Sequence, residues 1–439
     1  MLMTAITSNE YSSQCNDYYD ETILSKIVPP SKFDFHATTR DNQQTAVEYQ
    51  TSSLQDVITT KGHSEHNSCH EEQPVEDQSY MKPSQLTRVK YLKFLTSPNV
   101  LLEQLPCPPS MRKFIVDKRQ EISNIVHDRD DDRLLVIIGP CSIHNVDEAM
   151  VYAARLSEQA KLYESTLMIV MRVYFEKPRT TYGWKGLIND PLLDGTNDIN
   201  LGLKMARQLL LDITRLQLPC SCEFLHPILS HYIADLMCWI AIGARTTESQ
   251  IHREFVSGLP MPVGFKNSTT GNIQIAVDAC VSSRTGHTYL SLDPYGSIIC
   301  NTTWGNDDVH VVLRGGSATG PNYSQKHVSD TKHLLDRHKV NTQIMIDCSH
   351  GNSLKHYENQ LLVIQDVCQQ IASSTNRTIM GVMIESNLES GNQVLIEGEK
   401  DRLVYGQSVT DSCIGWDSTL DVLKLLSDAV RNRRMNEKK

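Results

Sequence analysis

Charged or metal-binding residues lie at or just after the ends of eight short apolar runs of the sequence, one residue to each run. Four are cations, two are glutamates, and the others are a cysteine and a histidine, which can both bind metal. In chain order they are Cys141, Arg172, Glu223, Arg245, Lys266, Arg314, His350 and Glu385. Solvation explains any one polar residue after an apolar run, but eight in eight runs indicate that these residues form a site.

The cations of this set, with one lysine in the loop after the second run, predict a ligand that carries several negative charges. These residues are Arg172, Lys177, Arg245, Lys266 and Arg314. Gathered in one place they repel one another unless anions lie between them, and arginine binds phosphate or carboxylate bidentately. Arg179 with Thr180 could take a second phosphate. For any one of these residues, a structural ion pair is the alternative.

Three of these eight residues, Cys141, His350 and Glu385, together with the later Asp411, offer sulfur, nitrogen and oxygen atoms to a metal. Such a mixed set suits Zn, Mn, Fe or Co better than Mg or Ca. Spacing alone supports it weakly, because each residue type is more often structural and the four are spread over much of the chain. Their placement after apolar runs is what favours a metal site.

The elements that must position these residues alternate between strands and helices. The apolar runs span 134–139, 167–173, 219–225, 242–246, 262–266, 309–315, 343–349 and 380–386. Segments with helical spacing separate most of them, a pattern typical of a parallel sheet buried on both faces. Eight strands predict a closed (β/α)8 (TIM) barrel, whose active sites lie at the C-terminal ends of the strands. A further strand-like piece, 287–293, is assigned to a hairpin or loop excursion.

The chain divides into three predicted parts. Residues 1–84 hold thirteen acidic and five basic residues, a net of −8 out of −10 for the whole chain. Their polar, aperiodic composition predicts a low-complexity, disordered acidic tail. Residues 85–133 have helical spacing and form an N-terminal arm, and residues 134–434 form the barrel.

The composition excludes several classes of protein. No stretch approaches the about 20 apolar residues of a membrane span, and an acidic chain is a poor nucleic-acid ligand. Glu10, Asp17 and Asp20, without a nearby cation, argue against a targeting presequence and predict a cytosolic protein. The twelve cysteines lack finger-type pairs, so free thiols are expected, with Cys220 and Cys222 packed in a strand.

Longer blocks of sequence resemble a known family. They are GPCSIH (139–144), MRVYFEKPRTTYGWKGLINDP (171–191), IGARTTESQIHRE (242–254), PVGFKN (262–267), LRGG (313–316), IDCSHGNS (346–353), GVMIES (381–386) and YGQSVTDSCIGW (405–416). From about residue 88 to 434 the chain resembles type I 3-deoxy-D-arabino-heptulosonate 7-phosphate (DAHP) synthases of the metal-dependent, feedback-regulated subgroup. These enzymes condense phosphoenolpyruvate with erythrose 4-phosphate and water, the first step of the shikimate pathway.

The resemblance assigns roles position by position. It implies a divalent metal held by Cys141, His350, Glu385 and Asp411, and a homodimer or homotetramer. It implies three groups of substrate contacts. The phosphoenolpyruvate phosphate goes to Arg245, Lys266, Arg314 and the Ala244 backbone, its carboxylate to Arg172 and Lys177, and the aldose phosphate to Arg179 and Thr180.

Two proton-transfer roles follow as hypotheses. The metal would polarise the aldehyde oxygen as a Lewis acid, and Lys177 would protonate the developing alkoxide. A donor that works at neutral pH would need its pKa lowered by the neighbouring cations. Glu223 would orient or deprotonate the water that attacks C2 of phosphoenolpyruvate.

Several positions depart from the family pattern. Asn145, Leu192, Asn197 and Ile240 are scattered, and none is an implied ligand. The others fall where the family senses its aromatic effector: Gln85, Leu86, Ser230, His231, Pro260 and the stretch 293–306. We expect feedback inhibition by phenylalanine or tyrosine to be altered or absent, with ordinary drift and retained regulation as the alternative.

Two other functions are alternatives to this one. The sister reaction of 3-deoxy-octulosonate phosphate synthases uses arabinose 5-phosphate, but the segments KPRTT and TDSCIGW favour the four-carbon aldose. A catalytically dead barrel that serves as a regulatory or binding subunit would not need to keep Cys141, Lys177, His350, Glu385 and Asp411. Phosphate release from the two substrates distinguishes an enzyme from a dead barrel.

Overall fold

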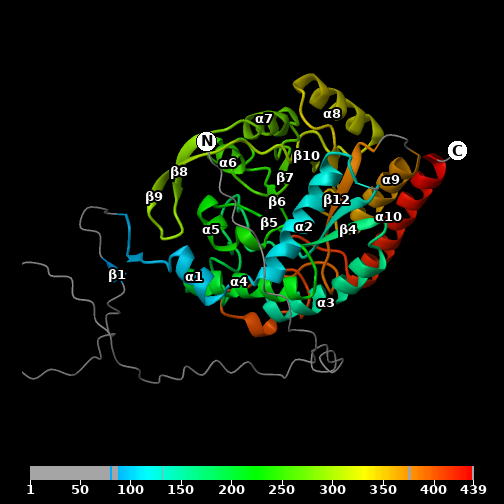
Figure 1. Ribbon diagram of the computed structural model, residues 1–439. Helices are drawn as coiled ribbons and strands as arrows, with labels where there is room; N and C mark the ends of the chain where they lie inside the picture. The colour runs from blue at the N-terminus through cyan, green and yellow to red at the C-terminus, as the bar shows by residue number, and fades with distance from the viewer. Residues whose placement is uncertain (1–79, 82–87, 131, 374–376, 438–439) are drawn as a thin grey trace, which may run out of the picture. The chain divides into compact units, whose positions relative to one another are not determined.

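The computed structural model describes residues 80–81, 88–130, 132–373 and 377–437 (Figure 1). The tail predicted over residues 1–84 therefore lies outside the described residues, except for β1 (Tyr80–Met81), which pairs antiparallel with β2 (Leu92–Lys93). The departures Gln85 and Leu86 also lie outside them. Among the described residues, no helix is both long and apolar enough to cross a membrane.

Eight parallel strands close into a barrel, which confirms the predicted (β/α)8 fold. Around the barrel the order is β10-β11-β12-β3-β4-β5-β6-β7. The strands are β3 (Leu134–Gly139), β4 (Leu167–Arg172), β5 (Cys220–Glu223), β6 (Trp239–Ile242), β7 (Val263–Lys266), β10 (Val309–Leu313), β11 (Ile344–Asp347) and β12 (Ile379–Glu385). Every residue in them is buried, as expected for strands covered on both faces. Cys220 and Cys222 pack in β5 as predicted.

One predicted strand was misplaced. The run 242–246 begins where β6 ends, because the apolar residues of the strand precede it and Gly243 starts a turn that accepts hydrogen bonds from Thr246 and Thr247. Arg245 therefore lies in the loop after β6. The departure Ile240 is fully buried in the middle of this strand, where it is opposite Val263.

Helices surround the barrel and cover its outer face (Figure 1). The arm contributes α1 (Pro98–Gln104) and α2 (Pro109–Val126), each opened by a proline, as is common at the first helical position. The others are α3 (Val146–Leu162), α4 (Ile199–Arg215), α5 (Ser230–Ile233), α6 (Gln250–Val256), α7 (Gln274–Ser283), α8 (Gln325–His338), α9 (Asn359–Ser373) and α10 (Trp416–Glu437).

Two departures from the family pattern have a local explanation. Asn145 caps α3, because its side chain accepts hydrogen bonds from the backbone of Asp147 at 2.9 Å and Glu148 at 3.3 Å. Asparagine caps a helix about as well as aspartate does. Asn197 has a φ of +54°, a left-handed conformation that asparagine tolerates better than most residues.

The extra strand-like piece forms a hairpin outside the barrel, as predicted. β8 (Thr288–Leu292) pairs antiparallel with β9 (Ile298–Thr302). The turn between them contacts the arm, since the Asn99 backbone donates a hydrogen bond to Pro294 O at 2.8 Å.

Candidate active site

The predicted site residues gather around one cavity of about 560 Å³ at the C-terminal ends of the strands. Eleven of them line it: Arg172, Lys177, Arg179, Thr180, Glu223, Ala244, Arg245, Lys266, Arg314, His350 and Asp411. The other two, Cys141 and Glu385, are buried next to it, in hydrogen-bond contact with Lys177 and Arg172 respectively. The structure therefore brings the whole predicted set together.

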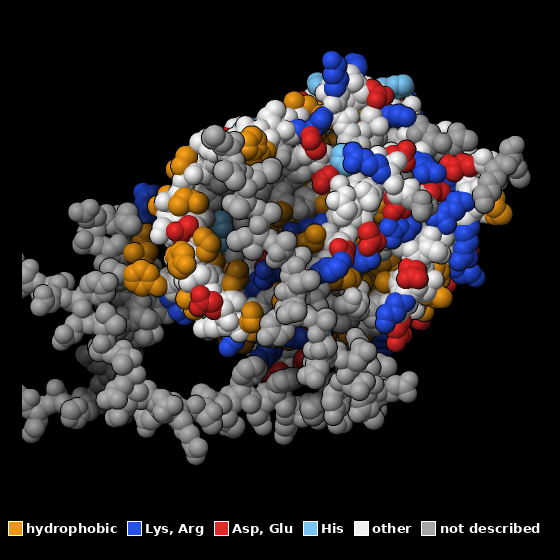
Figure 2. Space-filling view, in the orientation of Figure 1, with side chains coloured by type: hydrophobic (Ala, Val, Ile, Leu, Met, Phe, Trp, Pro, Cys, Tyr) orange, Lys and Arg blue, Asp and Glu red, His pale blue; other side chains and the backbone are white. Residues whose placement is uncertain are grey.

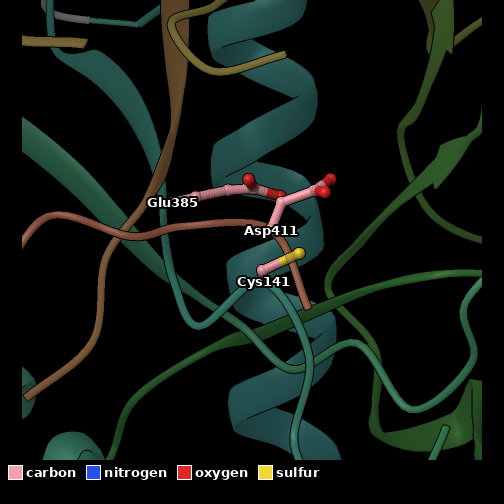
Figure 3. A group of neighbouring side chains, drawn as sticks. All are labelled: Cys141, Glu385 and Asp411. Carbon is pink, nitrogen blue, oxygen red and sulfur yellow. The ribbon is translucent and has the colours of Figure 1, made fainter. Parts of the chain in front are cut away.

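Three of the four candidate metal ligands meet at one point (Figure 3). The thiol of Cys141 and carboxylate oxygens of Glu385 and Asp411 all lie within 4.8 Å of one another. They come from the loop after β3, the end of β12 and the loop before α10. His350 is adjacent, with Nε2 3.8 Å from Glu385 Oε1. Sulfur, nitrogen and carboxylate donors at this spacing can hold a transition metal or zinc.

Lys177 lines the cavity and also contacts one of the candidate metal ligands. Its Nζ is 3.0 Å from Cys141 Sγ and donates to Cys141 O, also at 3.0 Å. Burial lowers the pKa of this ammonium, but the negative charges of Cys141, Glu385 and Asp411 outweigh burial and the Arg172 cation, so the pKa is raised. The expected lowering was wrong, because it counted the neighbouring cations without the acidic set below them.

Arg172 is fully buried at the end of β4 and is already well bonded. Its Nη2 donates to Glu385 Oε1 at 2.8 Å and to Cys141 O at 3.1 Å, while Nε donates to Pro140 O at 3.1 Å. The guanidinium also lies 3.5 Å from the ring centroid of Tyr174. Arg172 therefore fixes the position of two candidate metal ligands while it lines the cavity.

Lys266 and Arg314 present positive charge from β7 and from the loop after β10. Lys266 Nζ forms an ion pair with Asp347 at 2.8 Å. Arg314 is largely buried, and its guanidinium donates to Gly315 O at 3.3 Å but pairs with no carboxylate among the described residues. Burial lowers the pKa of Arg314. A buried cation without a counter-ion favours an anionic ligand.

Arg179 and Thr180, the residues expected to take a second phosphate, line the cavity with exposed side chains. Arg245 Nη2 donates to Thr180 Oγ1 at 2.9 Å, which links the two groups of cations. Arg179 donates a hydrogen bond from Nε to Trp184 O at 2.8 Å.

Glu223 ends β5, and its carboxylate oxygen Oε1 is buried with no hydrogen-bond partner among the described residues. A Cβ on Gly243 would lie 2.0 Å from this oxygen, so the glycine leaves room for the Glu223 carboxylate in its present position. Nearby Glu176 is buried and accepts a hydrogen bond from the His226 backbone at 3.3 Å. Burial raises the pKa of Glu176 to about 8. The hydrogen bond from His226 acts against this rise, and the negative charge of Glu223 adds to it. Glu176 is therefore mostly protonated at neutral pH, unlike an ordinary glutamate.

Sequence reasoning missed Asp347, the charged residue that ends β11. Besides Lys266, its carboxylate contacts His350 Nδ1 at 2.9 Å and Ser349 Oγ at 2.5 Å. A histidine held through one nitrogen presents the other to a metal. Asp347 thus joins Lys266 of the cavity to His350, one of the candidate metal ligands.

Gln360 and Lys355 were missed as well. The Gln360 side chain, on α9, donates to Glu385 O and accepts from Glu385 N, both at 3.0 Å, and so fixes the end of β12. Lys355 lines the cavity from the loop after β11. Neither carries a sequence signal, because Gln360 resembles any polar helix residue and Lys355 any loop cation.

Comparisons with known proteins agree with this site. A family model described as the DAHP synthetase I family matches residues 113–424, a range that holds every candidate residue. The chain is 51% identical over 348 residues, 79% of this chain and 97% of the other, to "Phospho-2-dehydro-3-deoxyheptonate aldolase, Phe-sensitive" of Escherichia coli (strain K12). It is 47% identical over 352 residues, 80% and 99% of the two chains, to the protein of Enterobacter agglomerans named Trp-sensitive. A solved phospho-2-dehydro-3-deoxyheptonate aldolase from Francisella tularensis SCHU S4 matches with a TM-score of 0.76 at 49% identity, over 79% of this chain and 99% of that one.

Proposed function

The chain belongs to the DAHP synthetase I family, and on that premise we propose how the residues at its barrel mouth carry out the family's reaction. It is an enzyme, a DAHP synthase of aromatic amino-acid biosynthesis. Its substrates are phosphoenolpyruvate and erythrose 4-phosphate, which condense with water and release inorganic phosphate. The alternative of a dead barrel receives no support from the relatives. We place the enzyme in the cytosol, without nucleic acid or membrane as a partner.

One observation carries the assignment of roles. The cavity lined by cations adjoins the four candidate metal ligands, and Lys177 both lines the cavity and contacts Cys141. Lys266, Arg314 and Arg245 bind the phosphate of phosphoenolpyruvate, with the Ala244 backbone beside them. Lys177 and Arg172 bind its carboxylate. The aldose phosphate falls to Arg179 and Thr180, which Arg245 joins to the first group. Two anions held side by side lower the barrier through orientation.

Cys141, His350, Glu385 and Asp411 fit a divalent metal, namely Mn, Fe, Co or Zn. The fit is supported by three donor atoms within 4.8 Å and by the buried thiol, whose proton must leave when metal binds. A metal bound there supplies Lewis acidity to the aldehyde oxygen.

The chain's own residues move the protons. Lys177, kept charged by the acidic set beside it, donates a proton to the oxygen that becomes the new hydroxyl group. Glu223 lines the cavity, and its carboxylate accepts a proton from the water that attacks C2 of phosphoenolpyruvate. Phosphate then leaves from C2 and is held by Arg314 and Lys266.

We also propose that feedback control differs from that of the relatives. A second cavity, of about 260 Å³, lies outside the barrel mouth and is lined by Ser230, His231 and Asn301 among others. Ser230 and His231 depart from the family pattern, and Asn301 lies in the departing stretch 293–306. Pro260, another departure, directly follows Leu259, which also lines this cavity. Relatives named for different effectors are about equally similar to this chain, so overall identity does not select an effector.

We also propose that the protein forms a homodimer or homotetramer. Hydrophobic side chains gather over β8 and β9 (Figure 2), where Leu290 and Ile298 are 80% and 78% exposed. Trp304, just beyond β9, is 99% exposed, and Phe94 of the adjoining arm is 74% exposed. Exposed apolar side chains concentrated in one region favour an interface, and a second copy of the chain is the simplest partner.

Removal of metal is expected to abolish phosphate release from the two substrates, and Mn, Fe, Co or Zn should restore it to different extents. Direct titration of the chelator-treated protein should show strong metal binding that a Cys141→Ser variant loses. Cys280→Ser is the matched control, because Cys280 is equally buried but lies on α7. Full activity after complete chelation would contradict the assignment.

Glu223→Gln is expected to lower kcat by roughly 100-fold or more, because general-base catalysis typically contributes that much. The KM for phosphoenolpyruvate should change little. Glu176→Gln is the control, since Glu176 is already protonated at neutral pH and lies outside the cavity lining. If turnover of Glu223→Gln is undiminished while substrate binding is normal, Glu223 does not activate the water.

Phenylalanine, tyrosine and tryptophan, added one at a time to a steady-state assay, should reveal the altered control. Phenylalanine and tyrosine are expected to inhibit weakly or not at all. Strong inhibition by micromolar levels of either would show that regulation is retained despite the substitutions.

Leu290→Asp is expected to shift the protein toward a smaller species in light scattering, because a buried charge destabilises an apolar interface. Leu362→Asp is the control: Leu362 is 59% exposed on α9, away from the hairpin. A wild-type protein that is monomeric at all concentrations would refute the proposed oligomer.

A further inference from the structure

Three buried asparagines lie in the loops that carry the phosphate-binding cations. Asn267 follows Lys266 at the end of β7, Asn322 lies in the loop after β10, and Asn352 lies in the loop after β11. Their exposed fractions are 0%, 3% and 3%. None belongs to the metal set or lines the cavity, so the proposed mechanism leaves them without a role.

The asparagines hold the backbone on both sides of Arg314. Its N–H donates to Asn267 Oδ1 at 2.8 Å, and its carbonyl accepts from Asn352 N at 3.2 Å. The next residue is held in the same way: Gly315 N donates to Asn322 Oδ1 at 2.7 Å, and Gly315 O accepts from Asn267 Nδ2 at 3.0 Å. Because β10 ends at Leu313, these bonds take the place of a strand ladder.

The three asparagines also bind to one another, through side chains and the Asn322 backbone, and to the neighbouring strands. Asn322 Nδ2 donates to Asn267 Oδ1 at 3.2 Å, and Asn322 N donates to Asn352 Oδ1 at 2.7 Å. Asn352 Nδ2 in turn donates to Leu313 O at 3.1 Å and Asp347 O at 2.9 Å. The network therefore links β7, β10 and β11, which carry Lys266, Arg314 and the Asp347 counter-ion.

Close packing of the backbone accompanies the network. Gly315 has a φ of +69°, and a Cβ on it would lie 2.4 Å from the Gly351 carbonyl carbon. A Cβ on Gly351 would in turn lie 2.7 Å from Gly315. The loops after β10 and β11 thus touch directly, and a small shift of one moves the other.

Amides suit this place better than carboxylates would. An amide can hold a backbone through both donor and acceptor atoms without adding charge. A buried carboxylate in the same position would compete with a phosphate for the Arg314 guanidinium, which pairs with no other carboxylate among the described residues.

We propose that Asn267, Asn322 and Asn352 form a positioning network that sets the Arg314 guanidinium for the phosphate of phosphoenolpyruvate. The inference rests on the proposed function, because it assumes that Arg314 binds this phosphate. The asparagines touch no substrate. They act by fixing the Arg314–Gly315 backbone, so that binding does not have to order it.

Asn322→Ala tests the network, because it removes the bonds to Gly315 N and to Asn267 while leaving the cavity lining unchanged. The dissociation constant and KM for phosphoenolpyruvate are expected to rise about tenfold, the effect of one or two lost buried hydrogen bonds. The KM for erythrose 4-phosphate and kcat should stay within about threefold of wild type, because Asn322→Ala keeps the Arg314 side chain itself and the aldose phosphate is bound by Arg179 and Thr180.

Asn306→Ala is the matched control. Asn306 is also buried, and its side chain donates to the carbonyls of Val256, Leu259 and Met261, near the start of β10 rather than its end. It should lower the thermal midpoint without weakening phosphoenolpyruvate binding. Equal loss of binding in both variants would mean that Asn322 is merely structural.

A double-mutant cycle with Arg314→Ala decides whether Asn322 acts through Arg314. In the Arg314→Ala background, Asn322→Ala should no longer change the dissociation constant of phosphoenolpyruvate; additive losses would overturn the inference. If Asn322→Ala does not fold, Asn322→Ser carries the same comparison. Failure of the wild-type protein to bind phosphoenolpyruvate would instead refute the proposed function, whereas normal wild-type binding with an unaffected Asn322→Ala refutes only the network.

Discussion

Mutual repulsion among cations at the barrel mouth is the constraint on which the rest of the site depends. Two of the five charges are balanced inside the protein, since Arg172 pairs with Glu385 and Lys266 pairs with Asp347. Lys177 lies against Cys141. The residual positive charge is therefore left at the open side of the cavity, where anionic substrates can neutralise it. The acidic residues that balance the cations are also the candidate metal ligands or their neighbours, so the anion and metal sites are joined by charge.

Barrel closure explains why the metal set could not be found from spacing. Cys141 follows β3 and Glu385 ends β12, the first and last strands of the barrel, which pair directly when it closes. Asp411 is brought in by the loop before α10, which is tied to the end of β12 by the bridge between Ser386 and Ile414. Residues at opposite ends of the barrel sequence thus become neighbours only through the complete fold.

The barrel and its rim could be predicted from the sequence because each buried strand is a short apolar run with a polar residue at its end or in the loop just after it. The prediction failed where this signal is absent or depends on contacts between distant residues. Arg245 was assigned to a strand end because the apolar stretch before it was overlooked, and it lies in a loop. The pKa of Lys177 was misjudged because its contact with Cys141 is not visible in the sequence. Asp347 and Gln360 act through partners on other elements, which no local pattern reveals.

One chain segment contributes to both cavities, and it bears on how the proposed change of control can leave the active site intact. The segment after β5 leads from Glu223 to Ser230 and His231, so it borders both cavities. Its attachment near the active site is a backbone bond, from His226 N to Glu176. A backbone donor is present whatever the side chain, so substitutions at Ser230 and His231 leave that attachment unchanged. Drift in the outer cavity can therefore alter an effector site without moving Glu223.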